Sequence, residues 1–393
     1  MTRLSKGLSL IALSLSLCLS PAIAEQNRTV TDMRGVKVTV PSDPQRIATI
    51  DDGFVEGVFT HLGEIDRVKV IGSWSMKRDY RYQFETRDGS TYEHRGLNTM
   101  KYLYPWLDNL PVFNSPQGNV LNFETLASAN PELVIMRVGD CTVNDRKEGS
   151  SRHAIETIEA MGIPLIVLNA PKGADLSTMK DELRVLGDLF DKQEKALALA
   201  DYLASTEKMI RERTQGIADN EKSRVLYLGL NPDARKKGAA GNVFGVNTPE
   251  SYIIETIANA KNAFTGEGFG VAMSAEQIYA LDPDVIILPT QNGYHPAREL
   301  YEAPYFAILE ELRAIKNKRI YAMPWSPMNC ARRVEYPIDM LIIAKAAYPD
   351  RFSDISVYDF ALKFYQDVYG VDVKQAEGLR STQLLDWMKD NDF

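Results

Sequence analysis

The sequence predicts an α/β protein of two lobes with mainly parallel sheets, bridged by one long α-helix, with a ligand cleft between the lobes. Two observations support this prediction. The stretch Leu176–Asn220 contains no proline and only the glycines Gly187 and Gly216, and it is rich in residues of high helix propensity. Alternating strand and helix patterns lie on both sides of this stretch, and a motif of the first side recurs 152 residues later on the second.

Residues 1–24 have the features of a cleavable signal peptide. Arg3 and Lys6 precede the short apolar run Leu8–Leu19, and Ala22-Ile23-Ala24 is a small-residue cleavage site. Cys18 raises the alternative of a lipoprotein signal. However, the preceding Leu17 is large where such signals have a small residue, so we favour cleavage after Ala24 and a location in the periplasm.

The net charge of the chain argues against nucleic acid as a partner. Removal of Arg3 and Lys6 changes the formal net charge from −8 to −10. An acidic protein of this kind is repelled by phosphate backbones and anionic membrane surfaces. A local basic pocket remains compatible with this charge.

The first lobe is predicted over residues 25–175. A hairpin is expected at residues 30–40, followed by the strand Arg46–Ile50, the turn Asp51-Asp52-Gly53, the helix Phe54–Leu62 and the strand Val68–Ile71. Residues 75–110 show no clear period but are rich in aromatic residues, so we expect a functional or partly helical loop. Its seven aromatic residues are Tyr80, Tyr82, Phe84, Tyr92, Tyr102, Tyr104 and Trp106.

The internal repeat consists of a helix, a proline turn and a buried strand. It covers residues 122–135 and again residues 274–287, with Glu124 matching Glu276 and Pro131 matching Pro283. The flanking elements correspond as well: a helix at 154–161 and a strand at 164–168 parallel a helix at 306–314 and a strand at 319–323. Such alternation of strands and helices predicts a mainly parallel sheet in each lobe.

The bridge is predicted over residues 176–221 and the second lobe over residues 222–393. Asp191 and Glu194 have the spacing of a capping box, which predicts a short helix, a break and a long helix from Lys192 to Ile217. A helix of this length spans roughly 38 Å. The second lobe starts with a strand at 224–228, and its amphipathic helical tail, residues 350–393, is expected to pack back on a lobe.

The candidate ligand site lies at the carboxyl ends of the strands, where parallel sheets bind ligands. The residues there are aromatic and basic, a set that suits a bulky anion because rings stack and guanidinium groups bind carboxylate or catecholate oxygens. The first lobe contributes Trp74, Tyr80, Tyr82 and Arg137, with Asp51 and Asp52, and the second contributes Tyr227, Asn231, Arg235, Lys236, Tyr294, His295, Trp325, Arg332 and Arg333.

Each candidate also has a purely structural interpretation. Arg137 and Arg333 could pair with nearby acids, and Tyr227 could belong to the core. His295 could be solvated, and Asp51-Asp52-Gly53 could only cap the following helix, which we favour over ligation. The aromatic loop could be a packed lid without ligand contact.

The motifs of common enzymes and metal proteins are missing from the sequence. Residues 238–245 are glycine-rich but lack the ending of a phosphate-binding loop, the four histidines lie far apart, and neither a Cys-x-x-Cys nor a Gly-x-Ser-x-Gly motif occurs. We therefore predict no catalysis, no intrinsic cofactor and no bare-metal site. Cys141 and Cys330 are either a disulfide across the cleft or two separate thiols.

Taken together, these segments resemble the periplasmic solute-binding proteins of ABC importers for siderophores, cobalamin and haem. The resemblance covers nearly the whole mature chain, from Arg46-Ile-Ala-Thr-Ile through the two repeated motifs to Ala344-Lys-Ala-Ala-Tyr-Pro349. It implies two lobes joined by a backbone helix, and a glutamate on each lobe, here Glu124 and Glu276, that docks on permease arginines. The alternative is that each is only a glutamate in the first turn of a helix, where the helix dipole favours a negative charge.

The resemblance implies a periplasmic receptor for a metal chelate, with a ferric siderophore as the expected ligand. Haem, a corrinoid, a nickel or cobalt chelate and molybdate are alternative ligands, and an exported chelatase-like enzyme is an alternative of another class. The implied partners are an inner-membrane permease with its ATPase and, upstream, an outer-membrane receptor. The protein itself is expected to be a monomer.

Overall fold

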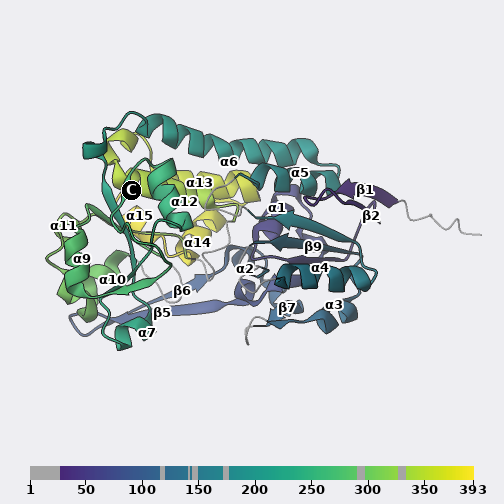
Figure 1. The fold of residues 1–393 in the computed structure, drawn as a ribbon, viewed down its shortest axis with the longest axis horizontal. Helices are drawn as coiled ribbons and strands as arrows, with labels where there is room; N and C mark the ends of the chain where they lie inside the picture. The colour runs from purple at the N-terminus through teal and green to yellow at the C-terminus, as the bar shows by residue number, and fades with distance from the viewer. Residues whose placement is uncertain are drawn as a thin grey trace, which may run out of the picture.

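Two α/β lobes lie at opposite ends of the molecule, and the long helix α6 runs along one side of both (Figure 1). The computed structural model describes residues 27–115, 120–139, 142–143, 149–170, 177–289, 297–325 and 333–393. The predicted signal peptide lies outside these residues. Within them the chain forms two larger sheets, one in each lobe, and two hairpins. The predicted fold class is confirmed.

The first-lobe sheet has the strand order β10-β9-β3-β4-β7-β8 and is parallel except for β8. Its strands are rich in buried β-branched and aliphatic residues, as expected of a sheet covered on both faces. The predicted hairpin at residues 30–40 is present as β1 (Asn27–Thr31) and β2 (Lys37–Pro41). The sheet strands are β3 (Ile47–Ile50), β4 (Val68–Ser73), β7 (Val112–Ser115), β8 (Val120–Leu121), β9 (Leu133–Val138) and β10 (Leu165–Asn169), with helices α1 (Phe54–Leu62), α3 (Phe123–Ala129) and α4 (Ser150–Ala160).

The second-lobe sheet is mixed. β11, β13, β15 and β16 are parallel, whereas β12 pairs antiparallel with both β11 and the edge strand β14. The helix expected at residues 306–314 is instead a 3₁₀ helix, Pro304–Leu309, followed by the short α11 (Arg313–Lys316). The other elements are β11 (Arg224–Gly229), α7 (Pro232–Lys236), β12 (Gly241–Val243), α8 (Pro249–Tyr252), β13 (Lys261–Asn262), β14 (Val271–Met273), α9 (Ala275–Leu281), β15 (Val285–Leu288), α10 (Ala297–Glu302) and β16 (Ile320–Ala322).

The internal repeat is confirmed down to individual hydrogen bonds. Helices α3 and α9 both end in a residue of left-handed conformation, Asn130 and Asp282. The acid after each proline then accepts a backbone N–H from the start of a neighbouring strand: Glu132 from Arg46, just before β3, at 3.0 Å, and Asp284 from Arg224, the first residue of β11, at 2.8 Å. These bonds place β9 beside β3 and β15 beside β11.

The bridge consists of α5 (Met179–Leu189) and α6 (Gln193–Thr214). The predicted break is present, but the predicted capping box is wrong. Asp191 has a φ of 55° and pairs with Arg28, and Lys192 occupies the N-cap without a side-chain capping bond to the helix. The 22 residues of α6 extend for roughly 33 Å, and the helix packs on α5 and on α12 (Tyr336–Ala347), which belongs to the second lobe.

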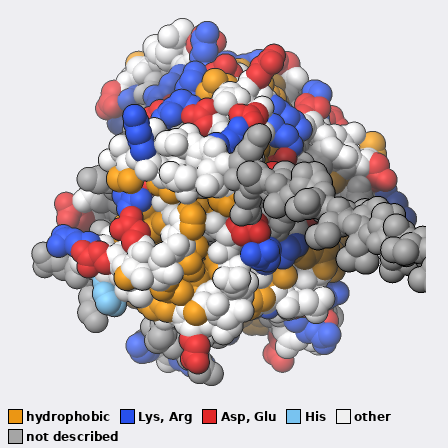
Figure 2. Space-filling view, turned by 90° about the vertical axis from the view of Figure 1, so that its right-hand side faces the viewer, with side chains coloured by type: hydrophobic (Ala, Val, Ile, Leu, Met, Phe, Trp, Pro, Cys, Tyr) orange, Lys and Arg blue, Asp and Glu red, His pale blue; other side chains and the backbone are white. Residues whose placement is uncertain are grey.

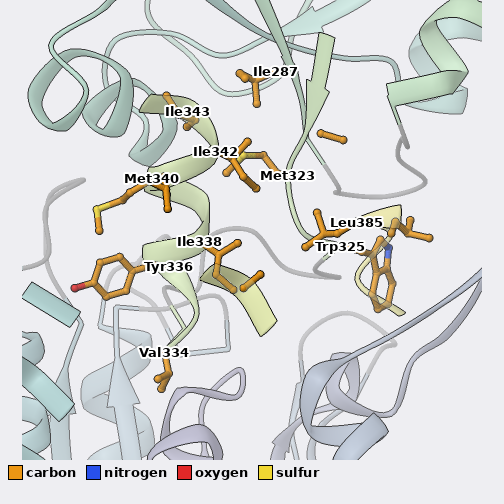
Figure 3. Packing of buried hydrophobic residues seen from close by; sticks show 14 of the residues in the cluster. Ile287, Met323, Trp325, Val334, Tyr336, Ile338, Met340, Ile342, Ile343 and Leu385 are labelled. Atoms are coloured by element: carbon orange, nitrogen blue, oxygen red, sulfur yellow. The ribbon is translucent and has the colours of Figure 1, made fainter. Parts of the chain in front are cut away.

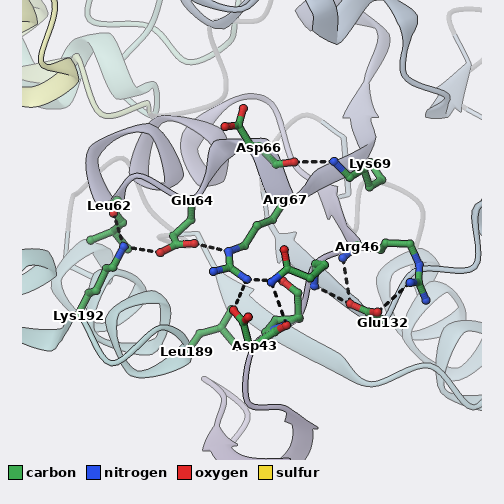
Figure 4. A network of polar contacts seen from close by, with 12 residues as sticks. Asp43, Arg46, Leu62, Glu64, Asp66, Arg67, Lys69, Glu132, Leu189 and Lys192 are labelled. Atoms are coloured by element: carbon green, nitrogen blue, oxygen red, sulfur yellow. Dashed lines mark hydrogen bonds and ion pairs between the residues drawn. The ribbon is translucent and has the colours of Figure 1, made fainter. Parts of the chain in front are cut away.

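A network of polar contacts anchors the start of α6 to the first lobe (Figure 4). The ammonium group of Lys192 bonds the carbonyl of Leu62 at 2.6 Å and pairs with Glu64. Glu64 also pairs with Arg67, which in turn binds Asp43. Glu64 is 6% exposed, so this part of the network is shielded from solvent and holds the helix more firmly than an exposed ion pair would.

The two lobes also contact each other directly around α12. This helix is buried over most of its length, and Val334, just before it, points towards the first lobe (Figure 3). A Cβ added to Gly57 of α1 would lie 3.0 Å from Cγ2 of Val334. A glycine is therefore needed at this point of close approach.

The C-terminal tail packs back on the molecule, as predicted. It forms α13 (Val357–Tyr369), α14 (Val373–Thr382) and α15 (Asp386–Asp390). Helix α13 contacts α1 and α12, and α14 contacts first-lobe elements α2 (Thr99–Leu103) and β6 (Thr91–Leu97). The tail is thus a further connection between the lobes.

The predicted aromatic loop contains a hairpin, β5 (Asp79–Glu85) and β6 (Thr91–Leu97), which reaches from the first lobe to the second (Figure 1). At its tip the N–H of Arg87 donates to the carbonyl of Glu302 at 2.8 Å, and the Arg87 side chain pairs with Glu310 at 2.9 Å. The segment is therefore folded structure and not an irregular loop.

Candidate functional site

Four neighbouring strands bring polar residues to the carboxyl edge of the first-lobe sheet. Asp52 follows β3, Ser73 ends β4, Asn114 lies opposite Ser73 on β7, and Thr142 follows β9. Gly72 allows the close approach of β4 to the end of β3, because a Cβ there would lie 2.4 Å from the backbone nitrogen of Asp51. Together these residues form what we call the polar recess: Asp52, Ser73, Ser75, Asn114 and Thr142.

Asp52 is the central residue of the polar recess and is 3% exposed. Its Oδ1 accepts hydrogen bonds from the hydroxyl of Thr142 at 2.8 Å and that of Ser75 at 3.4 Å. Its Oδ2 is buried and has no hydrogen-bond partner among the described residues. Burial raises the pKa of Asp52, and the charge of Asp51 adds to this effect, whereas hydrogen bonds from Ser73 and Thr142 oppose it.

Asp51 and Asp52 have different roles. The carboxylate of Asp51 accepts the backbone N–H of Val55 at 2.8 Å and that of Gly53 at 3.2 Å, so it stabilises the start of α1. The favoured capping interpretation therefore holds for Asp51. Asp52 turns towards Thr142 instead and makes no such bond to the helix among the hydrogen bonds of the described residues.

Arg333 comes from the other lobe and lies beside the same turn. A Cβ added to Gly53 would be 3.9 Å from its Cδ. Its Nη1 is buried and has no hydrogen-bond partner within the part of the chain that the structure describes. Asp339 lies near enough to sense its charge: burial raises the pKa of Asp339 to about 7, and Arg333 opposes this shift.

An aromatic cluster lies where the hairpin meets the second lobe. The rings of Tyr80 and Trp325 stack with centroids 5.8 Å apart and planes 12° apart. The guanidinium of Arg78 lies over Tyr80 at 5.3 Å and over Trp74 at 5.7 Å. The predicted residues Trp74, Tyr80 and Trp325 are thus brought together, with Trp325 (Figure 3) contributed by the second lobe.

Other predicted site residues are engaged in contacts of their own. Arg137 is completely buried, forms two bonds to Glu182 at 2.6 and 3.0 Å, and lies over the ring of Phe54. Tyr227 packs edge-on against Phe244 in the core. These environments match the structural interpretations of Arg137 and Tyr227, and ligand contact by either residue stays a prediction.

The remaining predicted residues lie elsewhere or outside the described structure. Tyr82 lies on β5 with 2% of its surface exposed, and its ring is 6.1 Å from that of Tyr80. Arg235 is exposed on α7 and lies 4.1 Å over the ring of Tyr305. Asn231 caps α7 through the N–H of Ala234, and Lys236 is exposed near the end of that helix. The residues outside the description are Tyr294, His295 and Arg332, and also Cys141 and Cys330.

Sequence reasoning missed four residues of the polar recess. Ser73, Ser75, Asn114 and Thr142 were not among the candidates, because serine, threonine and asparagine are frequent at strand ends for structural reasons alone. Their position in the sequence is the signal that could have found them, because polar residues follow several parallel strands at one edge of the sheet. In the described ranges, no cluster of three or more His, Cys, Asp or Glu residues has the arrangement of a metal site.

The two predicted docking glutamates occupy equivalent positions. Glu124 and Glu276 are each the second residue of their helices, α3 and α9, and both are exposed. A hydrogen bond from Ser274 lowers the pKa of Glu276, which keeps this carboxylate charged.

At the first-lobe end of the molecule, hydrophobic side chains are exposed between charged ones (Figure 2). None of the described helices is long and apolar enough to cross a membrane.

This architecture is that of a known family. A model of the periplasmic binding protein family matches residues 96–327, more than half of the chain, and the chain belongs to that family. The resemblance inferred from the sequence is confirmed.

The individual relatives are only distantly similar to this chain in sequence. The chain is 23% identical to the molybdate-binding protein MolA of Haemophilus influenzae over 392 residues, covering 92% of this chain and 97% of MolA. It is 24% identical over 238 residues to the ABC transporter substrate-binding lipoprotein YvrC of Bacillus subtilis, covering 60% of this chain and 67% of YvrC.

Solved structures with the same fold cover nearly the whole chain. A periplasmic solute-binding protein from Veillonella parvula superposes with a TM-score of 0.71 at 22% identity, covering 94% of this chain and 100% of that one. Molybdate-bound MolA gives 0.61 at 18% identity, covering 88% and 98%. A nickel–histidine complex of Helicobacter pylori CeuE gives 0.57 at 21% identity, covering 90% and 99%. These likenesses establish the fold.

Proposed function

We propose that this protein captures a metal chelate between its lobes and delivers it to an inner-membrane ABC permease, with a ferric siderophore as the expected cargo. Its family consists of binding proteins, and the matched relatives are substrate-binding components of ABC transporters. The observation that carries the proposal is the junction of the lobes, where buried polar groups of both lobes lack partners among the described residues. Such groups are costly unless a ligand pairs with them.

The aromatic cluster supports a bulky ligand over a small ion. Trp74 and Tyr80 are partly exposed beside the guanidinium of Arg78, and the buried Trp325 supports the ring of Tyr80 from behind. Aromatic surface of this kind stabilises organic ligands through burial and stacking, but it contributes little to a hydrated inorganic ion.

Molybdate is the principal alternative ligand, because MolA covers most of this chain. Arg333 suits such an oxyanion, but the polar recess does not, because the oxygens of Asp52 and Asn114 that lack partners among the described residues are acceptors. Haem, a corrinoid and a nickel or cobalt chelate fit the aromatic cluster as a siderophore does, and a comparison of ligands must distinguish them.

The proposed partners follow from the family and from the repeat. A cognate permease and its ATPase are expected of an importer, and the two exposed, equivalent acids Glu124 and Glu276 suit a two-fold permease surface that carries arginines. We propose a location outside the cytoplasm. Mass analysis of the mature protein tests the export signal, because cleavage after Ala24 leaves Glu25 as the first residue, whereas lipoprotein processing would leave a lipidated Cys18.

A purified sample tests the cargo. We expect thermal stabilisation by ferric siderophores, and a visible absorption band with iron in the protein as it co-purifies. Stabilisation by molybdate alone would show that the cargo is an oxyanion and not a chelate. A Soret band would identify the cargo as haem. Turnover of a bound chelate would contradict a binding function.

A further inference from the structure

We propose that the ligand is dipolar: it places a hydrogen-bond donor against Asp52 in the polar recess and an anionic oxygen against Arg333. The chemical class is a metal chelate that carries an N–H or ammonium group together with carboxylate or similar oxygens. This inference rests on the proposed function, because it assumes that the cargo binds between the lobes.

The first observation is the state of Asp52. Its Oδ2 is unpartnered among the described residues although the side chain is almost completely buried. A buried polar atom without a partner destabilises the protein, and more so when it is charged. Since the atom lies at the carboxyl edge of a parallel sheet, where ligands bind, a ligand donor is the natural partner.

The second observation is that the polar recess offers acceptors and few protons. Thr142 and Ser75 direct their hydroxyl protons to Oδ1 of Asp52, at 2.8 and 3.4 Å. The hydroxyls of Ser73 and Ser75 are 2.6 Å apart, so one of them donates its proton to the other. The amide oxygen of Asn114 is buried without a partner among the described residues and adds another acceptor. An incoming N–H or ammonium group therefore matches the recess, whereas an incoming oxygen anion does not.

The third observation is the position of Arg333 beside the same turn. Its side chain reaches Gly53, the residue after Asp52, and its Nη1 is a buried donor without a partner among the described residues. A ligand that spans the two lobes would thus meet an acceptor site on the first lobe and a donor site on the second. Both ends must be satisfied at once, which selects a ligand with both kinds of group.

The test uses Asp52→Asn, which keeps the shape of the side chain but replaces one carboxylate oxygen with an NH₂ donor. The probes are nickel(II)–histidine and the ferric complex of desferrioxamine B, which carry amine groups, and ferric citrate and molybdate, which carry none. We expect the parent protein to bind at least one amine-bearing chelate, and Asp52→Asn to weaken that binding at least tenfold in calorimetric titrations. Binding of the amine-free probes is expected to stay equal or improve.

Two further variants complete the test. Arg333→Gln is expected to weaken the binding of the amine-bearing chelates as well, because their anionic oxygens lose the guanidinium donor. Asp201→Asn is the matched control: Asp201 is exposed on α6, where it pairs with Lys180 at 3.2 Å, and its replacement is expected to change nothing. The melting temperature of ligand-free Asp52→Asn should equal or exceed that of the parent, because the substitution removes a buried, incompletely paired charge.

The outcomes separate the inference from the function on which it rests. Equal affinity of Asp52→Asn and parent for an amine-bearing chelate, or preference of the parent for ferric citrate, overturns the dipolar ligand and leaves chelate capture intact. A lower melting temperature of ligand-free Asp52→Asn shows a structural Asp52 and also overturns it. Binding of molybdate alone, or of no probe, overturns chelate capture itself and the inference with it.

Discussion

Asp339, at the start of α12, is an acid whose surroundings favour its protonated form in the folded protein. Burial raises its pKa to about 7; Glu335 and Glu250 reinforce the shift, and Arg333 opposes it. Glu299 behaves alike, since burial raises its pKa to about 8 although a bond from Tyr305 counteracts this. Both acids would ionise near pH 4 in the unfolded chain.

These pKa shifts predict that stability falls as the pH rises. Between about pH 4 and 8 the native state binds more protons than the unfolded state at Asp339 and Glu299, so the free energy of unfolding decreases with pH over this range. Asp339→Asn mimics the protonated acid and should flatten the decrease. Urea unfolding of parent and variant at pH 5 and pH 8 measures the effect. A parent that is more stable at pH 8, or an equal slope in the variant, would contradict this explanation.

Trp325 illustrates a residue whose role in packing must be separated from its role in binding. It is 1% exposed and stacks on Tyr80, and a Cβ added to Gly96 would lie 3.1 Å from its ring. We therefore expect Trp325→Ala to lower the free energy of unfolding by about 3–5 kcal/mol. Trp325→Phe keeps a ring and should cost less, so it is the better variant for ligand titrations. A Trp325→Ala protein as stable as the parent would show that the stack contributes little.

At the scale of elements, the sequence was most informative where the chain repeats itself. The pairs Pro131 with Pro283 and Glu132 with Asp284 mark the same helix–strand unit, because each acid must bond the start of a neighbouring strand. The hairpin β5–β6 was missed although its signal is present: Tyr80, Tyr82 and Phe84 alternate with polar residues, and Asp88-Gly89 provides a turn. Grouping the aromatics as one loop hid this alternation.

The site could be predicted only in part, for a physical reason. Residues that act through local position, such as Asp51 at the start of α1, follow from sequence neighbours. The polar recess instead depends on the register of four strands and on the approach of Arg333 from the other lobe. Nor does the sequence show that Arg137 pairs with Glu182, 45 residues away on α5.

The repeated helices α3 and α9 carry a prediction about transport. Replacement of both Glu124 and Glu276 by alanine should leave ligand affinity unchanged, because both side chains are exposed on short helices that are not part of the polar recess or the aromatic cluster. Uptake of the ligand by cells should be lost, since two permease contacts disappear together. Glu311→Ala, another exposed acid, serves as control. Normal uptake by the double variant would remove the docking role.

At the scale of the whole molecule, several connections besides α6 hold the lobes together in the described part of the chain. Val334 packs against Gly57, the tail contacts α1, α2 and β6, and Arg87 at the hairpin tip bonds Glu302 and Glu310. We therefore expect little closure on ligand binding, with a change in radius of gyration below about 1 Å by small-angle X-ray scattering. A larger contraction would show that these contacts open and close as a hinge.

The central claim is that the ligand lies between the lobes and touches both Asp52 and Arg333. Anomalous diffraction from crystals of the protein with its metal chelate tests this claim most directly, because it locates the metal without reference to the protein. We expect a metal peak between the carboxyl edge of β3, β4 and β9 and the start of α12. A peak on an outer surface of either lobe would contradict it.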